Sequence, residues 1–440
     1  MKTPICTFLQ NYASDDNLRL HMPGHKGFGE VERFDLTEIE GADSLYEANG
    51  IIKESETIAS QLFASRTLYS TEGSSLAIRA MLYLAMLMNH SGERPTVLAG
   101  RNAHKVFVSA MALLDFDVEW LAGSDSYLSS TVTPEDIDKK ISSMAKPPLA
   151  VYITSPDYLG NMADIRGIKE VCRRHGVLLL VDNAHGAYLA FTEPSLHPIT
   201  LGADMCADSA HKTLPCLTGT AYLHLGDNIP EEVSARAKTA MALFGSTSPS
   251  YLLLASLDRA NAYISDGYRA KLSEFTHKLN ALKERLKAAG YELVGNEPMK
   301  LTLMPKSYGY TGYELATHLQ SCKIIPEFSD PDFLVLMPTP EITDSELARI
   351  ENVLTSLDKR EPLTTLPPTF TPTKKAMSPR TAILSSAEKI STENSEGRIL
   401  ADITVGCPPA VPIVVSGEVI TKEDIEAFKY YGIDYCSVVK

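Results

Sequence analysis

Short apolar runs alternate with segments of helical spacing along residues 50–270. Runs such as VLLLVD and PLAVYITS lack the in-and-out alternation of half-exposed strands, whereas IIKESETIASQLFA and SSLAIRAMLYLAMLMNH carry apolar residues at helical intervals. Strands that are apolar throughout are typical of a mainly parallel sheet covered by helices on both faces. The pattern therefore predicts a large α/β domain, with further strands at PTVLAG, DVEWLA and TAYLHL.

The pattern changes beyond residue 250. Residues 251–290 have the spacing of a long helix that ends at Gly290, and residues 291–357 mix short apolar runs with a helical segment. The Pro- and Thr-rich stretch EPLTTLPPTFTPT follows as an extended connector. We therefore expect four parts: an N-terminal lead-in (1–40), the large domain (41–270), a small α+β domain (271–360), and a connector with a C-terminal region (361–440).

Composition and charge exclude several classes of protein. The 440 residues are 44% hydrophobic and 22% charged, as in folded globular proteins and unlike collagen, coiled coils or disordered chains. The formal charge of −14 disfavours nucleic acid and membrane surfaces as partners and suits a cationic small substrate. The seven cysteines form no CxxC pair, so we expect neither a disulfide framework nor a zinc ribbon. Without a secretory-signal layout or an apolar run near the roughly 20 residues of a membrane span, the sequence indicates a cytoplasmic protein.

Three segments carry candidate chemistry, and each also has a purely structural interpretation. In TEGSSLAIRAM, Gly73, Ser74 and Ser75 open a helix and could cradle a phosphate or only cap the helix. Asp182 ends the buried strand of LLLVDNAHG, where it could pair with a cationic ligand or form an Asx-turn. Lys212 in ADSAHKTL could be an amine nucleophile beside apolar walls or an ordinary surface lysine.

The order and spacing of these segments resemble the fold-type-I enzymes that use pyridoxal 5′-phosphate. Those enzymes combine an early Gly-Ser loop, a strand-end Asp and a later lysine, which here follows Asp182 by 30 residues. Further strings narrow the resemblance to the Orn/Lys/Arg decarboxylase family: LHMPGHKG, DLTEIEGADSL, RNAHKV, SPDYLGNMADI, VDNAHGAY, DSAHKTL, TSPSYLLLASLD and PPAVPIVVSGEVIT. Because the chain starts close to the first string, it resembles the short members that have no N-terminal receiver-like domain.

The resemblance implies an aspartate aminotransferase-like large domain and a role for each matching residue. Lys212 would carry the cofactor, Asp182 would pair with the pyridinium nitrogen, and His104 would stack on the ring. The other cofactor-binding residues that it implies are the phosphate ligands Gly73, Ser74, Ser75, Ser209 and His211, the ring neighbours Ala184 and His185, and the pair Thr247 and Ser248, which would reach the phosphate of a neighbouring subunit. Shared sites of this kind imply a homodimer or a larger homo-oligomer.

The reaction implied by the resemblance is decarboxylation of a basic amino acid to its amine, with a role in polyamine biosynthesis. Arginine is slightly favoured over lysine and ornithine. Candidate acids for the distal cation of the substrate are Asp43, Glu47 and Glu418, each of which could equally be a capping or surface residue. Tyr46 and Glu47 lie in a segment that departs from the family, which bears on substrate identity, and Ala410 stands where glycine is usual.

Two alternatives stay open, and one metal site is not expected. An aminotransferase or carbon–sulfur lyase would use the same scaffold, but Arg380 and Arg398 do not stand in the context of an α-carboxylate clamp. A non-catalytic descendant is disfavoured because Lys212 and the other candidates are all present. The pair His21 and His25 has the spacing of helical metal ligands, yet the intervening Pro23-Gly24 breaks a helix.

Overall fold

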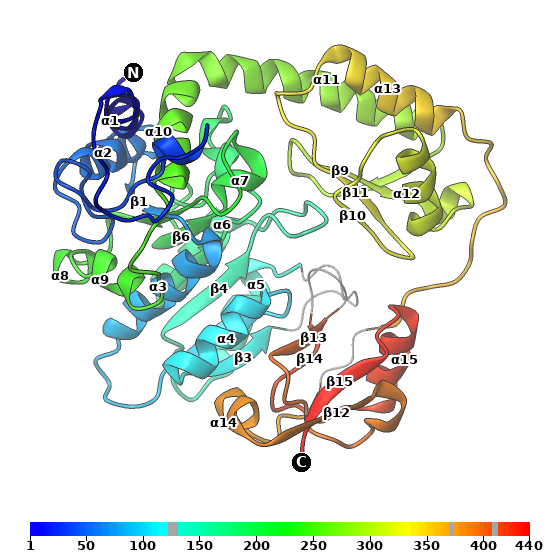
Figure 1. Ribbon diagram of the computed structural model, residues 1–440. Coiled ribbons are helices and arrows are strands. Elements are labelled where there is room, and N and C mark those ends of the chain that lie inside the picture. The colour runs from blue at the N-terminus through cyan, green and yellow to red at the C-terminus, as the bar shows by residue number, and fades with distance from the viewer. Residues whose placement is uncertain (122–130, 370–372, 407–411) are drawn as a thin grey trace. The chain divides into compact units, whose positions relative to one another are not determined.

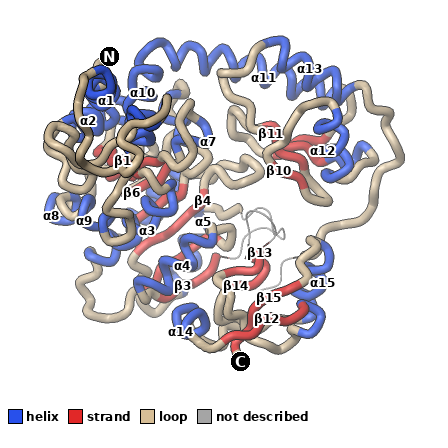
Figure 2. Tube along the Cα trace, viewed as in Figure 1, coloured by secondary structure: helices blue, strands red, loops and turns tan. Residues whose placement is uncertain are grey.

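The computed structural model (Figures 1 and 2) describes residues 1–121, 131–369, 373–406 and 412–440. It contains two compact units. The first unit comprises residues 1–93 and 165–271, and the second comprises residues 94–164 and 272–440. This division follows internal packing and is coarser than the four sequential parts expected from the sequence, which stay a prediction.

The first unit is an α/β structure. Its helices and helical turns are α1 (Pro4–Ser14), η1 (Glu32–Phe34), α2 (Ile51–Phe63), α3 (Gly73–Leu87), α6 (Ile165–His175), η2 (Ala187–Phe191), α7 (Ala210–Thr213), α8 (Glu231–Ser234), α9 (Ala237–Ala242), α10 (Tyr251–Tyr263) and η3 (Ile264–Tyr268). Its strands are β1 (Arg66–Ser70), β5 (Leu178–Asp182), β6 (Met205–Asp208) and β7 (Ala221–Leu225). Helices α1, α2 and α10 pack together, and α3 packs across β1, β6 and β7 (Figure 1).

The strands of the first unit lie in the order β1, β7, β6, β5. β5 and β6 are parallel, whereas β7 is antiparallel to both of its neighbours. Asp182 pairs with Ala207, and Ser70 pairs with Ala221 at the start of β7. The last residues of β1, β5 and β6 therefore lie at one edge of this sheet, where ligands bind in α/β folds.

Aromatic side chains fill the core of the first unit. Phe63 lies 5.0 Å from Tyr222 and 5.1 Å from Phe191, measured between ring centroids, and Tyr69 lies 5.9 Å from Tyr222. All four side chains are buried. Offset and edge-to-face pairs of this kind contribute about 0.5–1.5 kcal/mol each beyond their burial, so they stabilise the packing of helices against the sheet.

The second unit combines a parallel sheet with smaller antiparallel sheets. Its strands are β2 (Thr96–Gly100), β3 (Asp117–Leu121), β4 (Ala150–Thr154), β8 (Glu292–Val294), β9 (Leu301–Met304), β10 (Phe328–Ser329), β11 (Leu334–Leu336), β12 (Ala387–Ser391), β13 (Thr404–Gly406), β14 (Pro412–Val415) and β15 (Tyr435–Val439). β2 is parallel to both β3 and β4. The antiparallel groups are β10-β11-β9-β8, β12-β15 and β13-β14.

The helices of the second unit begin at clear sequence signals. They are α4 (Lys105–Leu114), α5 (Pro134–Ser143), α11 (Arg269–Ala288, which starts in the first unit), η4 (Pro305–Tyr308), α12 (Gly312–Ser321), α13 (Asp344–Thr355), α14 (Pro379–Leu384), η5 (Thr392–Asn394) and α15 (Lys422–Tyr430). Helices α5, α12, α13 and α15 each begin with a Thr-x-x-Asp/Glu capping box that satisfies free backbone N–H groups. Lys278 and Arg285 of α11 pair with Asp344 and Glu351 of α13, which lies alongside it (Figure 1).

The α/β class and the mainly parallel strands predicted from the sequence are confirmed. The five predicted strand segments correspond to β2, β3, β4, β5 and β7, and Gly290 follows the end of α11 as predicted. The prediction of one continuous helix over 251–290 is wrong. Asp266 and Gly267 leave helical geometry, with φ of +77° at Gly267, so α10 and α11 are separate. No described helix has the length and apolar character needed to cross a membrane.

Candidate active site

The carboxyl edge of the first unit's sheet brings three predicted segments together. Asp182 is the last residue of β5, Ser209 follows β6, and Gly73 follows β1 after a short turn. Ser209 Oγ donates a hydrogen bond to Ser74 Oγ at 2.8 Å. The Gly-Ser loop and the Ser-x-x-Lys motif, which are far apart in the sequence, are therefore in direct contact.

The start of α3 has the features of an anion-binding site. Gly73 has φ of +69°, which favours glycine, and a Cβ added there would meet no atom within 4 Å. The preceding residue, Glu72, makes no side-chain cap to the helix. Backbone N–H groups and the positive end of the dipole of this 15-residue helix therefore lie beside the hydroxyls of Ser74 and Ser75.

Lys212 lies on the short helix α7, after β6, and reaches a histidine of the connection that follows β5. Its Nζ lies 3.1 Å from Nε2 of His185. His185 and Ala184 are buried on the turn after β5, where the backbone N–H of Ala184 donates to the carboxylate of buried Asp182 at 3.2 Å. His211 points elsewhere, because its Nδ1 contacts the carbonyl of Thr220 at 2.8 Å. The lysine, the histidine and the aspartate thus share one site.

A buried network that the sequence analysis missed adjoins this site. The carboxylate of Asp208 at the end of β6 contacts His197 at 3.0 Å, His224 at 3.1 Å and the amide of Asn183 at 2.7 Å. Burial raises the pKa of Asp208, but the two imidazoles lower it more, so its pKa lies below the usual range. Asp208 is the last residue of its strand, as Asp182 is, and this shared position was the sequence feature that could have identified it. No sequence feature identified the two histidines as its partners.

The remaining cofactor candidates have the following surroundings. His104, in the second unit, is the N-cap of α4, where its Nδ1 accepts from the backbone N–H of Val106 at 3.3 Å. Thr247 and Ser248 are exposed in the first unit, just before α10. His21 and His25 have separate partners, with the hydroxyl of Tyr12 at 2.6 Å and the carboxylate of Asp35 at 3.2 Å.

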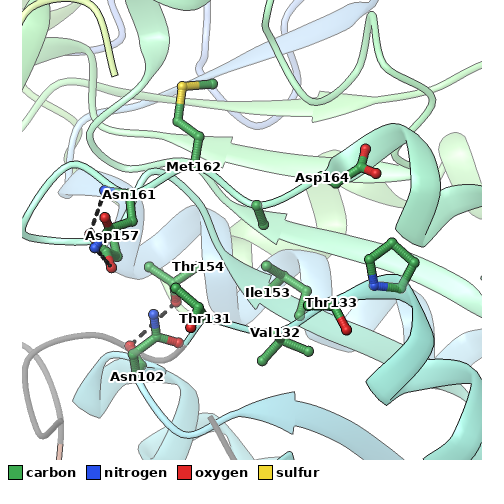
Figure 3. Close-up of a pocket in the computed structure, with 12 residues that line it drawn as sticks. Asn102, Thr131, Val132, Thr133, Ile153, Thr154, Asp157, Asn161, Met162 and Asp164 are labelled. Atoms are coloured by element: carbon green, nitrogen blue, oxygen red, sulfur yellow. Dashed lines mark hydrogen bonds between the residues drawn. The ribbon is translucent and has the colours of Figure 1, made fainter. Parts of the chain in front are cut away.

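A cavity of about 200 Å³ lies at the carboxyl ends of β2 and β4 in the second unit (Figure 3). Asn102, which precedes His104 by two residues, lines it together with Thr154 and the segment 157–164 from SPDYLGNMADI. Asn161 donates to both carboxylate oxygens of Asp157, at 2.8 and 2.9 Å. This motif therefore forms an ordered wall at the strand edge where α/β folds bind ligands.

Comparison with known proteins gives the family. The model of the major domain of Orn/Lys/Arg decarboxylases matches residues 3–304, and the model of their C-terminal domain matches residues 365–433. The chain belongs to the Orn/Lys/Arg decarboxylase family. It is an amino-acid decarboxylase, and the family membership predicted from the sequence is confirmed.

Individual relatives of the decarboxylase cover most of its length. The arginine decarboxylase of Halalkalibacterium halodurans is 30% identical, over 96% of this chain and 92% of that protein. The uncharacterized protein YaaO of Bacillus subtilis is 30% identical, over 97% and 93% of the two chains. The crystal structure of the Francisella novicida lysine decarboxylase LdcF matches with a TM-score of 0.80 and 19% identity, over 100% of this chain and 81% of that chain. The last similarity confirms the fold of this decarboxylase.

Two acids that the sequence offered for substrate recognition have internal partners in the decarboxylase. Both carboxylate oxygens of Glu418 pair with Arg101 at 2.8 Å, and both residues are buried. Asp43 accepts hydrogen bonds from five backbone N–H groups around the start of α2, including those of Gly50 and Ile52. Burial raises the pKa of Asp43, but these N–H groups lower it more, so its pKa lies below its usual value. Glu47 is exposed.

Of the two departures from the family pattern, the structure describes Tyr46 but not Ala410. Tyr46 is half-buried, and its hydroxyl lies so close to Gly245 that a Cβ there would be 2.0 Å away. Burial and the nearby charge of Glu72 raise the pKa of Tyr46 to about 12. A glycine at position 245 therefore makes room for the tyrosine. Ala410 lies outside the described residues.

Proposed function

We propose that the chain binds pyridoxal 5′-phosphate at the carboxyl edge of the first unit's sheet and decarboxylates a basic amino acid, with arginine as the first substrate to test. The observation that carries the proposal is the contact of Lys212 with His185 beside the turn of Asp182. Relatives named arginine decarboxylase support arginine; lysine and ornithine are the next candidates.

The residues at this edge suit each chemical group of the cofactor. The hydroxyls of Ser74, Ser75 and Ser209 offer donors for a phosphate, and His211 is a further candidate. Gly73 is proposed to shape the turn beside the phosphate, since its own N–H donates to the carbonyl of Gly219 at 2.7 Å. The buried carboxylate of Asp182 suits a protonated ring nitrogen, while Ala184 and His185 are proposed to flank the ring. The stacking role of His104, which belongs to the second unit, stays a prediction from the sequence. When bound, pyridoxal phosphate supplies an electron sink for the bond that breaks at the substrate Cα.

The chain's own residues would control protons and water during the reaction. Lys212 would attach the cofactor, and His185 lies within hydrogen-bond reach of its amine. After loss of CO₂, a proton must reach Cα, and Lys212 and His185 are the donors that the structure places together. Burial of Asp182 and Ala184 limits water at this edge, which suits release of a neutral gas from a carboxylate.

Substrate selection is proposed to involve an acid near the entrance of the site. A guanidinium group favours a bidentate carboxylate partner. Asp43 and Glu418 stay candidates, but each would first have to leave its internal hydrogen bonds. Glu47 is exposed and is therefore the first of the three to test.

We further propose a cytoplasmic homodimer with shared active sites and a biosynthetic role in polyamine formation. Thr247 and Ser248 are exposed, as expected for residues that reach a second subunit. The N-terminal segment of the first unit also exposes large apolar side chains, namely Leu18, Leu20, Met22 and Phe28. A second copy of the chain would cover such side chains, whereas the net charge of −14 opposes nucleic acid and anionic membranes.

The proposal is tested by product analysis with the protein reconstituted in pyridoxal phosphate. Arginine, lysine, ornithine and an unrelated amino acid are offered separately, and CO₂, amine and keto acid are measured. CO₂ and an equal amount of agmatine from arginine are expected. Keto acid without CO₂, in the presence of an acceptor, would move the function to an aminotransferase on the same scaffold.

A further inference from the structure

A fully buried carboxylate connects the strands of the first unit near the proposed cofactor site. Asp208, His197, His224 and Asn183 have no exposed surface. The two imidazoles share one oxygen of Asp208, and the amide of Asn183 donates to the other oxygen. A buried charge is strongly unfavourable unless hydrogen-bond donors surround it, and here three side chains contact the carboxylate.

The network reaches every strand of the first unit's sheet. Asp208 ends β6, and Asn183 directly follows the last residue of β5. His224 lies on β7, and its Nδ1 lies 2.9 Å from the hydroxyl of Thr67 on β1. The position of this one carboxylate is therefore coupled to all four strands.

The orientation of Asn183 depends on Asp208. The side-chain oxygen of Asn183 has no hydrogen-bond partner within the described parts of the chain, so its amide is held by the bond that its nitrogen donates to Asp208. A Cβ on Gly186 would lie 1.9 Å from that oxygen, so position 186 admits no larger residue unless Asn183 moves. Asn183 and Gly186 bound the turn that carries Ala184 and His185.

We propose that Asp208 is a positioning residue for the cofactor. Through its hydrogen bond with Asn183 it fixes the turn that carries His185 next to Asp182. Because Ser209 is the next residue in the chain, Asp208 also fixes the position of Ser209. His197 and His224 hold the carboxylate in place for this task. The inference rests on the proposed function, because the site that Asp208 positions is the proposed pyridoxal phosphate site.

The same strand provides a matched control. Asp204 precedes β6 at its opposite end, is also buried, and accepts from the backbone N–H of Leu179 at 2.7 Å. It also pairs with Lys169 at 2.6 Å. A variant without the charge of Asp204 therefore alters a buried carboxylate of the same sheet and leaves the residues at the carboxyl edge unchanged.

The experiment compares Asp208→Asn, Asn183→Ala and Asp204→Asn with the unaltered chain. The melting temperature of each apo protein and its dissociation constant for pyridoxal phosphate are measured, followed by kcat and KM for arginine. Asp208→Asn and Asn183→Ala are expected to weaken cofactor binding about tenfold or more and to lower kcat with little change in KM. Asp204→Asn is expected to lower the melting temperature and leave the cofactor dissociation constant unchanged. If Asp208→Asn does not fold, the cofactor affinity of Asn183→Ala tests the proposal.

Several results would overturn the inference. Cofactor affinity that is unchanged in both Asp208→Asn and Asn183→Ala would do so, as would an equal loss in Asp204→Asn, which would indicate a general effect of stability. A stoichiometric divalent metal that is lost in His197→Gln would make the cluster a metal site instead. If the unaltered chain binds no pyridoxal phosphate, the proposed function fails together with the inference; if it binds and decarboxylates normally while the variants match it, the inference alone fails.

Discussion

Lys212 Nζ lies 3.1 Å from His185 Nε2. The two residues come from different connections, one after β6 and the other after β5, and they meet because parallel strands end at the same edge of the sheet. An imidazole beside an amine offers a second proton carrier at the site. A contact between two separate motifs is therefore the centre of the proposed site.

Replacement of Lys212 tests its role as the residue that attaches the cofactor. Lys212→Ala is expected to abolish both turnover and the visible absorbance of the attached cofactor, because it removes the amine proposed to hold the cofactor. Lys212→Arg keeps the positive charge but supplies no neutral amine, so it is expected to be inactive too. Visible spectra and CO₂ release are measured on the same samples. Full activity of Lys212→Ala would contradict the whole assignment.

The carboxylate of Asp182 is expected to matter for chemistry more than for cofactor retention. Asp182→Asn removes the charge opposite the proposed ring nitrogen and leaves the phosphate donors of Ser74 and Ser209 intact. We expect a loss of about 100-fold or more in kcat, as when a preorganised electrostatic partner is removed, with a much smaller loss of cofactor affinity. Cofactor titration and steady-state kinetics separate the two effects. A variant that keeps its kcat but no longer holds the cofactor would reverse the roles proposed here.

The buried pair of Arg101 and Glu418 predicts an effect on stability. Glu418→Gln leaves the guanidinium of Arg101 without a charged partner, so we expect a loss of about 3–5 kcal/mol in the free energy of unfolding. The double variant Arg101→Met with Glu418→Leu is expected to recover much of this loss, because no buried charge remains. Urea unfolding of the single and double variants measures the difference. If Glu418→Gln instead unfolds like the original chain and raises KM for arginine alone, Glu418 is a substrate ligand.

The buried carboxyl of Asp330 is expected to make the free energy of unfolding depend on pH. Burial and the charge of neighbouring Asp332 raise the pKa of Asp330 from 3.8 to about 7, against the opposing effect of two backbone N–H groups. The folded state therefore retains a proton that the unfolded state loses, so this carboxyl stabilises the fold at low pH and loses that contribution as pH rises from about 4 to 7. The slope from this one group is up to roughly 1.4 kcal/mol per pH unit.

The variant Asp330→Asn isolates this contribution. An amide oxygen can still accept the backbone N–H groups of Asp332 and Phe333, which the carboxylate oxygen accepts at 2.7 and 2.6 Å. The variant is expected to show a flatter pH profile of unfolding free energy and to be at least as stable as the original chain at pH 8. Parallel profiles for the two proteins between pH 4 and 7 would exclude Asp330 as the source.

Strands with unbroken apolar runs and motifs with a strand-end charge could be predicted from the sequence. The segment VLLLVD identified both β5 and Asp182, and SAHK identified Lys212. By contrast, β1 and β6 were missed: RTLYS carries three polar residues among its five, and MCAD has only four residues. Helix α1 (Pro4–Ser14) was not predicted either; it lies within the N-terminal lead-in (1–40).

Partners of buried polar residues could not be predicted, because nothing local in the sequence reports them. Glu418 and Arg101 are 317 positions apart, and their pairing depends on how the second unit folds. Asp43 could be a substrate acid or a capping residue by its sequence. Its left-handed backbone, with φ of +68°, is what directs its carboxylate to the N–H groups at the start of α2. The histidines that hold Asp208 likewise stand at no diagnostic spacing.

The most direct test of the account is the release of CO₂ from carboxyl-labelled arginine by the purified chain reconstituted with pyridoxal phosphate, with Lys212→Ala as the parallel sample. The account predicts labelled CO₂ in an amount equal to the agmatine formed by the original chain, and none above background from the variant. An absence of labelled CO₂ from arginine, lysine and ornithine alike, in a protein that holds its cofactor, would contradict it.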